Sequence, residues 1–199
     1  IMKHMFGQLY SVSASGSIDP NLAESYSVSE DGKEYTFTLQ KGLTCHDGEA
    51  LTAEDAAYSF NRVADPEMAF TGNSAGFVYK SIDFIEARAD SELDVTIVLG
   101  GPNHIALGLI AEIYVHCKGS YENMTKEEAA TNPVGSGPYE FVKWDKGSQI
   151  VMKKTANPPI SANFENIIWR VIPEASTRTA ELIAGNVDMI TNASPDQVE

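Results

Sequence analysis

The segment 44–62, with the sequence TCHDGEALTAEDAAYSFNR, gathers residue types that could do chemistry. Cys45 and His46 could form a nucleophile with its base, and His46, Asp47 and Glu49 could bind a metal ion for hydrolysis. Adjacent residues at the end of a strand point to opposite faces, so the cysteine and histidine pair poorly. The three possible metal ligands lack the paired second histidine of zinc enzymes. A metal-dependent hydrolase using His46, Asp47 and Glu49 is therefore kept as the alternative function.

The second half of this segment predicts the start of a helix. Residues 52–55 have the sequence TAED, which matches the capping box in which a threonine and an acidic side chain satisfy the first amide groups of a helix. Glu54 and Asp55 also lie in the first turn, where the helix dipole favours negative charge. We therefore expect a helix to begin at Thr52, and we expect neither a catalytic residue, a bound metal nor a cofactor.

The composition is that of an ordinary soluble globular protein, with 199 residues of which 43% are hydrophobic and 21% charged. Acidic residues outnumber basic ones by 28 to 14, which gives a formal net charge of −14. A surface of this sign repels phosphate backbones, so nucleic acid is not an expected partner. The sequence contains no apolar run long enough to predict a membrane-spanning helix.

Two cysteines, Cys45 and Cys117, are too few for a disulfide scaffold and do not have the CxxC spacing of a zinc site. They could pair in an oxidising compartment, but a bond requires their Cα atoms to lie within about 7 Å, which the sequence cannot show. We predict two free, partly buried thiols and keep the disulfide as the alternative.

The first two thirds of the chain predict an antiparallel α+β unit. Tyr35, Phe37 and Leu39 alternate with polar residues, as in a strand with one buried face, and Asp31-Gly32 supplies the turn of a hairpin over 21–42. Three further elements follow from the same patterns: a strand over 94–101, a short buried helix within 102–115 and a polar helical turn over 124–132.

From about Pro133 onward the pattern changes to that of an α/β unit. Residues 135–138, GSGP, predict a tight turn or a hinge rather than a phosphate-binding loop. The expected elements are strands over 139–144 and 148–155, a strand buried on both faces over 164–172, a helix over 174–185 and a last strand over 187–190. This order implies a parallel strand pair with a right-handed crossover.

Three long blocks, read in order, resemble the family 5 extracellular solute-binding proteins of ABC importers, the peptide- and nickel-binding group. The blocks are residues 22–66, which end in CHDGEALTAEDAAYSFNRVADP, residues 132–154, which begin NPVGSGPY, and residues 167–190, which begin IIWRVIPEASTR. One departure from the family pattern is Cys45, where a large aromatic residue is usual.

The resemblance implies a mixed α/β fold of the periplasmic-binding-protein class, in which two lobes close on a ligand about a hinge. This chain would be a piece of such a protein, without the second lobe. Residues 11–132 would form a small inserted α+β domain, and residues 1–10 and 133–199 part of the first ligand-binding lobe.

The implied function is that of the substrate-binding component of an ABC importer, without catalysis. The protein would bind a peptide or similar small solute in the periplasm or outside the cell, as a monomer that is free or anchored as a lipoprotein. It would deliver the solute to the membrane subunits of the permease. The ligand-binding residues that the resemblance suggests are Thr191, Asn192 and Ser194 on a crossover loop beside the cleft, and Phe70 and Asn73 on a second loop near it.

Overall fold

The computed structural model describes residues 1–68, 77–122, 124–156 and 158–193. The elements of the first part are α1 (Met2–Met5), β1 (Tyr10–Val12), β2 (Ile18–Pro20), β3 (Ala23–Val28), β4 (Glu34–Leu39), α2 (Ala53–Ala64), a 3-10 turn (Pro66–Met68), α3 (Tyr79–Ser81), β5 (Phe84–Ala89) and β6 (Asp94–Leu99). Those of the second part are α4 (Ala106–Ile110), α5 (Lys118–Glu122), α6 (Lys126–Thr131), β7 (Tyr139–Asp145), β8 (Gln149–Lys154), β9 (Asn166–Arg170) and α7 (Ala175–Ile183).

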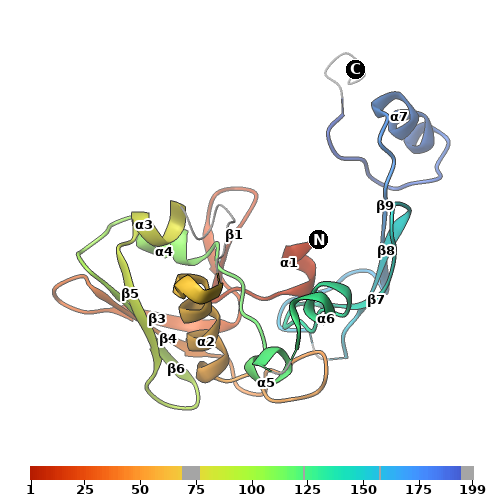
Figure 1. Ribbon diagram of the computed structural model, residues 1–199. Helices are drawn as coiled ribbons and strands as arrows, with labels where there is room; N and C mark the ends of the chain where they lie inside the picture. The colour runs from red at the N-terminus through yellow and green to blue at the C-terminus, as the bar shows by residue number, and fades with distance from the viewer. Residues whose placement is uncertain (69–76, 123, 157, 194–199) are drawn as a thin grey trace.

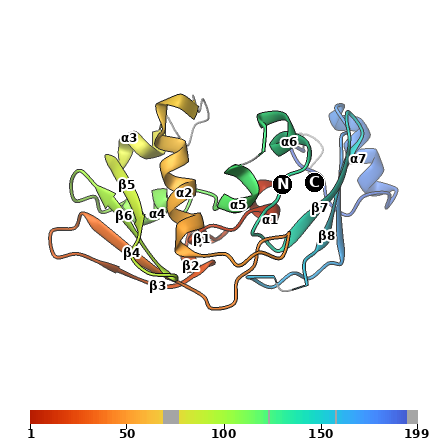
Figure 2. The same ribbon diagram turned by 60° about the horizontal axis from the view of Figure 1, so that its bottom comes forward.

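The strands form three antiparallel sheets, and two of them mark the two ends of the molecule (Figure 1). A four-stranded sheet has the order β3-β4-β6-β5 and is covered by α2, while β1 and β2 form a separate small hairpin. A three-stranded sheet has the order β7-β8-β9. Figure 2 shows α1 and α5 between these two ends, so the N-terminal segment lies at the centre of the structure.

The predicted hairpin is confirmed by β3 and β4. The two strands pair antiparallel, with Tyr26 opposite Phe37 and Val28 opposite Tyr35. Gly32 in the turn has a φ of 70°, a conformation that a residue with a side chain rarely adopts. The predicted strand over 94–101 is β6, which pairs with β4 on one side and β5 on the other.

The main core lies between the four-stranded sheet and α2. Ala53, Ala56 and Phe60 on the inward face of the helix are completely buried, as are Phe37 and Ile97 on the sheet. The small alanines let the helix backbone approach the sheet closely. Burial of large apolar side chains on both layers supplies most of the stability that this part of the chain can gain.

The capping box at the start of α2 is confirmed. The carboxylate of Asp55 accepts a hydrogen bond from the backbone N–H of Thr52 at 2.7 Å and from its hydroxyl at 2.9 Å. The other carboxylate oxygen accepts the backbone N–H of Lys118 at 2.7 Å. Asp55 therefore both begins α2 and fixes the start of α5 beside it.

The sheet at the other end differs from the prediction in three ways. The strand β9 is not buried on both faces, since Ile168 is 57% exposed and its neighbours alternate between half-buried and exposed. It pairs antiparallel with β8, and the strands of the described residues include no parallel pair. In the described part of the chain, residues 187–190 form no strand. An apolar run becomes a buried parallel strand only where a neighbouring strand offers hydrogen bonds in that direction, and the described residues provide none here.

Among the described residues, no helix has the length and apolar character needed to cross a membrane.

Candidate functional site

The suggested ligand-binding residues fall into two groups. Phe70, Asn73 and Ser194 lie outside the described residues. Thr191 and Asn192 follow α7 and are both exposed.

The loop that contains Thr191 and Asn192 is held by one arginine. The guanidinium of Arg178, on α7, donates to the carbonyl of Asn192 at 2.9 Å and to those of Ile172 and Pro173 at 2.9 Å and 2.7 Å. Asn192 has a φ of 55°, which asparagine tolerates better than most residues. Arg178 therefore fixes the loop to the segment after β9, while Thr191 and Asn192 are exposed.

The segment with His46, Asp47 and Glu49 does not form a metal site. Both ring nitrogens of His46 are used by the backbone: Nδ1 accepts from the N–H of Gly135 at 3.1 Å, and Nε2 donates to the carbonyl of Gly137 at 2.9 Å. Within the described residues, no group of three histidine, cysteine, aspartate or glutamate side chains could hold a metal ion. This geometry gives the hydrolase alternative no support.

Cys45 and Cys117 form a disulfide, so the prediction of free thiols is wrong. Their Sγ atoms are 2.03 Å apart and their Cα atoms 6.2 Å apart. The two cysteines are separated by 72 residues in the sequence, and only the packing of the loop after β4 against the start of α5 brings them together. Sequence separation carries no information about such a contact, so the sequence alone could not decide between free thiols and a disulfide.

The Gly135–Pro138 segment is a tightly packed turn against the N-terminal segment. The N–H of Gly137 donates to the carbonyl of Met5 at 2.9 Å, and the N–H of Gly7 donates to the hydroxyl of Ser136 at 3.0 Å. A Cβ atom at Gly135 would lie 1.8 Å from the carbonyl oxygen of Met5. Only glycine allows two backbones to cross this closely.

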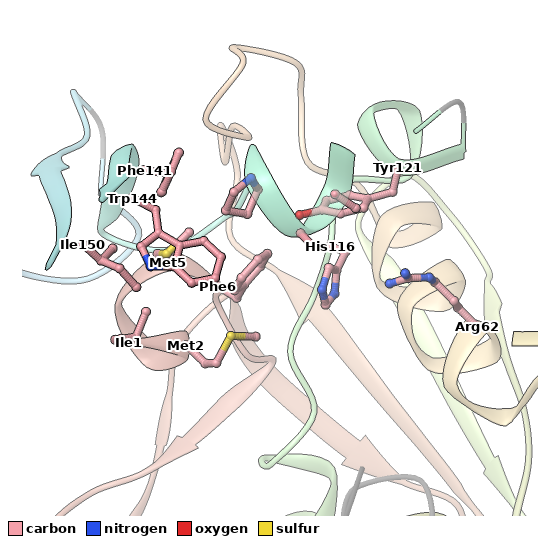
Figure 3. A pocket seen from close by; sticks show the side chains of 13 residues that line it. Ile1, Met2, Met5, Phe6, Arg62, His116, Tyr121, Phe141, Trp144 and Ile150 are labelled. Carbon is pink, nitrogen blue, oxygen red and sulfur yellow. The ribbon is translucent and has the colours of Figure 1, made fainter. Parts of the chain in front are cut away.

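An open cavity of about 360 Å³ lies beside this turn, between α1, the end of α2, α5, α6 and the sheet of β7 and β8 (Figure 3). Most of its surface is apolar, and its lining residues are Ile1, Met2, Met5, Phe6, Arg62, His116, Tyr121, Ala129, Ala130, Pro133, Phe141, Trp144 and Ile150. In Figure 3 the apolar side chains of α1 and the sheet face Arg62 and His116 across the hollow. A cavity of this kind can bind an apolar group.

The histidine in this cavity is neutral at neutral pH. The ring of His116 packs 4.6 Å from that of Phe6 and 5.1 Å from that of Tyr121, measured between centroids. Burial and the nearby charge of Arg62 lower the pKa of His116 to about 4. The guanidinium of Arg62 lies over the Tyr121 ring, 5.6 Å from its centroid. Arg62 therefore carries the positive charge of the cavity.

Neither this cavity nor the places of His116 and Arg62 in it could be predicted from the sequence. The lining residues come from six separate elements, and no spacing along the chain relates them. A sequence signal exists only for the single helix faces, not for the space between them.

Comparisons with known proteins show the family. Residues 17–199 match the bacterial extracellular solute-binding proteins, family 5 middle. The match spans most of the chain, and the chain belongs to this family.

Three relatives illustrate what the chain is similar to. It is 30% identical over 196 residues to the heme-binding protein A of Haemophilus influenzae, covering 87% of this chain and 35% of that protein. It is 27% identical over 202 residues to the dipeptide-binding protein of Escherichia coli K12, covering 90% of this chain and 37% of that protein. Its fold matches the crystal structure of NikZ from Campylobacter jejuni in complex with Ni(L-His), with a TM-score of 0.79 and 26% identity. The match covers 93% of this chain and 37% of NikZ. The chain thus spans little more than a third of the length of these relatives, and the expected fold class is confirmed.

Proposed function

We propose that the chain is part of a substrate-binding component of an ABC importer, which captures a peptide or similar small solute outside the cytoplasm and delivers it to the permease subunits. The observation that carries the proposal is the family match over residues 17–199, together with the matching fold. The intact protein would be a monomer in the periplasm or at the cell exterior, with a lipoprotein anchor as one form of attachment.

The proposed division of the chain is a small domain over 11–132 and a lobe made of 1–10 and 133–199. The four-stranded sheet and α2 share one buried core, most of which comes from the first range, with Leu9 and Tyr10 added from the segment 1–10. The segments 1–10 and 133–199 are joined by a second, smaller core of Met5, Phe6, Tyr139 and Met152. The small domain contributes to it the buried Tyr121 and the partly buried residues Tyr58, Tyr114, Met124 and Ala129. The support for the proposed boundaries is that each core draws mainly on one of the two parts.

The proposed solute contacts are Thr191 and Asn192, together with Ser194, Phe70 and Asn73. The support from the described residues is that Thr191 and Asn192 are exposed on a loop whose backbone Arg178 holds in place. Preorganised polar groups of this kind orient a solute without a large loss of entropy on binding.

The first ligands to test are those for which the relatives are named, which are heme, dipeptides and a nickel–histidine complex. We expect calorimetry of the full-length protein against such a panel to find one class that binds with a micromolar or lower Kd. Failure of every class would contradict the proposal.

A variant pair tests the proposed contacts. Asn192→Ala should weaken binding of that solute about tenfold or more, as expected for the loss of one buried polar contact. Asn163→Ala changes another exposed loop asparagine and should leave the Kd unchanged. Equal Kd values for the two variants would remove Asn192 from the site while leaving the function itself untouched.

A further inference from the structure

The point where the two proposed parts of the chain meet is a crossing of four segments. The turn 135–137 contacts the end of α1, the loop after β4 and the strand-like segment before α5. Besides the contacts of Gly137 with Met5 and of Gly7 with Ser136, the hydroxyl of Ser136 donates to the carbonyl of Val115 at 2.8 Å. Ser136 is buried, so these bonds are shielded from water.

His46 supplies three of the bonds at this crossing. Its backbone N–H donates to the carbonyl of Gly135 at 2.9 Å, its Nδ1 accepts from the N–H of Gly135, and its Nε2 donates to the carbonyl of Gly137. A nitrogen that accepts an N–H cannot carry a proton, and a nitrogen that faces a carbonyl must carry one. The arrangement therefore requires a neutral imidazole with the proton on Nε2.

We propose that His46 is a pH-sensitive positioning residue, which locks the Gly135–Gly137 turn onto the N-terminal segment when neutral and releases it when protonated. Protonation of Nδ1 would place two N–H groups against each other, His46 Nδ1–H and Gly135 N–H. One bond would be lost, and the Gly135 amide would remain buried without its acceptor, which costs more than the bond itself contributes.

The surroundings of His46 favour the neutral form on balance. Burial lowers its pKa, while the Gly137 carbonyl and the carboxylates of Glu140 and Asp47 act in the opposite direction. The charged groups that act on the ring are Asp47 on its own loop and Glu140 on β7, and the carbonyl of His4 on α1 lies against Gly137. The disulfide of the neighbouring Cys45 ties the loop that carries His46 to the segment before α5.

The inference concerns the chain's own junction and does not depend on which solute is bound. It is tested by amide hydrogen exchange, followed by mass spectrometry, on the full-length protein. The segment 132–139 is monitored between pH 7.5 and pH 5, with each rate divided by the intrinsic rate at that pH. We expect protection of this segment to fall about tenfold or more, because protonation of His46 removes the acceptor of the Gly135 amide and frees the turn to open.

The matched variants are His46→Gln, His4→Gln and His104→Gln. A glutamine amide offers an acceptor and a donor but does not titrate, so His46→Gln should keep protection and abolish its pH dependence. His4→Gln removes the other histidine at the crossing, and His104→Gln an exposed one far along the chain; both should behave as wild type. A pH-independent wild type, or an equal pH step in His46→Gln, would overturn the proposal. Should His46→Gln fail to fold, loss of the step in His4→Gln would overturn it instead.

Discussion

The two large sheets of the molecule bury their apolar residues to very different extents. In the four-stranded sheet with α2, the largest side chains, such as Phe37 and Phe60, are fully buried. In the sheet of β7 to β9 and in α7, Trp144 is 43% and Ile183 81% exposed, and α7 has no buried residue. The stability of this chain therefore comes mainly from the four-stranded sheet and α2, while β7 to β9 and α7 expose apolar surface.

The largest expected effect is at the centre of the first core. Phe60→Ala should lower the free energy of unfolding by about 3–5 kcal/mol, because it removes a large side chain and leaves a cavity. Ile183→Ala, at an exposed position of α7, should change it by about 0.5 kcal/mol or less. Urea denaturation of both variants measures the difference, and similar losses would show that the two regions contribute equally.

The disulfide should have the next largest effect. The double substitution Cys45→Ala and Cys117→Ala should lower the free energy of unfolding by about 2–4 kcal/mol, because the unfolded chain regains the conformational freedom of a long loop. The measurement is the denaturation midpoint of the double variant beside oxidised wild type. An unchanged midpoint would mean that the bond does not restrain the first part of the chain.

The cavity between the two regions predicts a pH dependence. The folded pKa of His116, about 4, lies below its ordinary value of 6.5, so its contribution to stability is present above pH 6.5 and is lost as the pH falls toward 4. At about 1.4 kcal/mol per unit, the loss approaches about 3 kcal/mol. Denaturation at pH 7 and pH 4 should show this loss in wild type and a smaller one in His116→Leu. The same loss in both proteins would refute the assignment to His116.

The smallest effects are expected at the two helix caps. Thr52→Ala, at the partly buried start of α2, should cost about 1 kcal/mol, and Thr125→Ala, at the exposed start of α6, about 0.5 kcal/mol. In α6 the hydroxyl of Thr125 accepts from the N–H of Glu128 at 3.2 Å. Thermal or urea denaturation measures the loss of stability in each variant. A larger loss in Thr125→Ala than in Thr52→Ala would contradict the expectation that a buried cap stabilises a helix more than an exposed one.

Local patterns predicted the first part of the molecule well. The alternation of Tyr35, Phe37 and Leu39, the glycine at 32 and the TAED box over 52–55 each act within a few residues, and each appears in the structure as expected. Periodicity and capping are properties of neighbouring residues, so a sequence expresses them directly.

Contacts between distant segments were not predictable in this way. The disulfide, the cavity around His116 and the bonds from His46 to the turn at Gly135 all join residues far apart in the chain. The strand over 164–172 was assigned the wrong partner and burial because pairing depends on which strand lies beside it. The family resemblance came from long blocks of sequence, which carry more information than any single spacing.

The most direct test of the central claim is calorimetry with the solute identified for the full-length protein, repeated with the 199-residue chain alone. The claim is that the solute is held between this part of the protein and the remainder. We predict a micromolar or lower Kd for the full-length protein and binding weaker by about 100-fold or more for the chain alone, a loss of about 2.7 kcal/mol. Equal affinity of the two proteins would contradict the claim, because this chain would then contain the whole site.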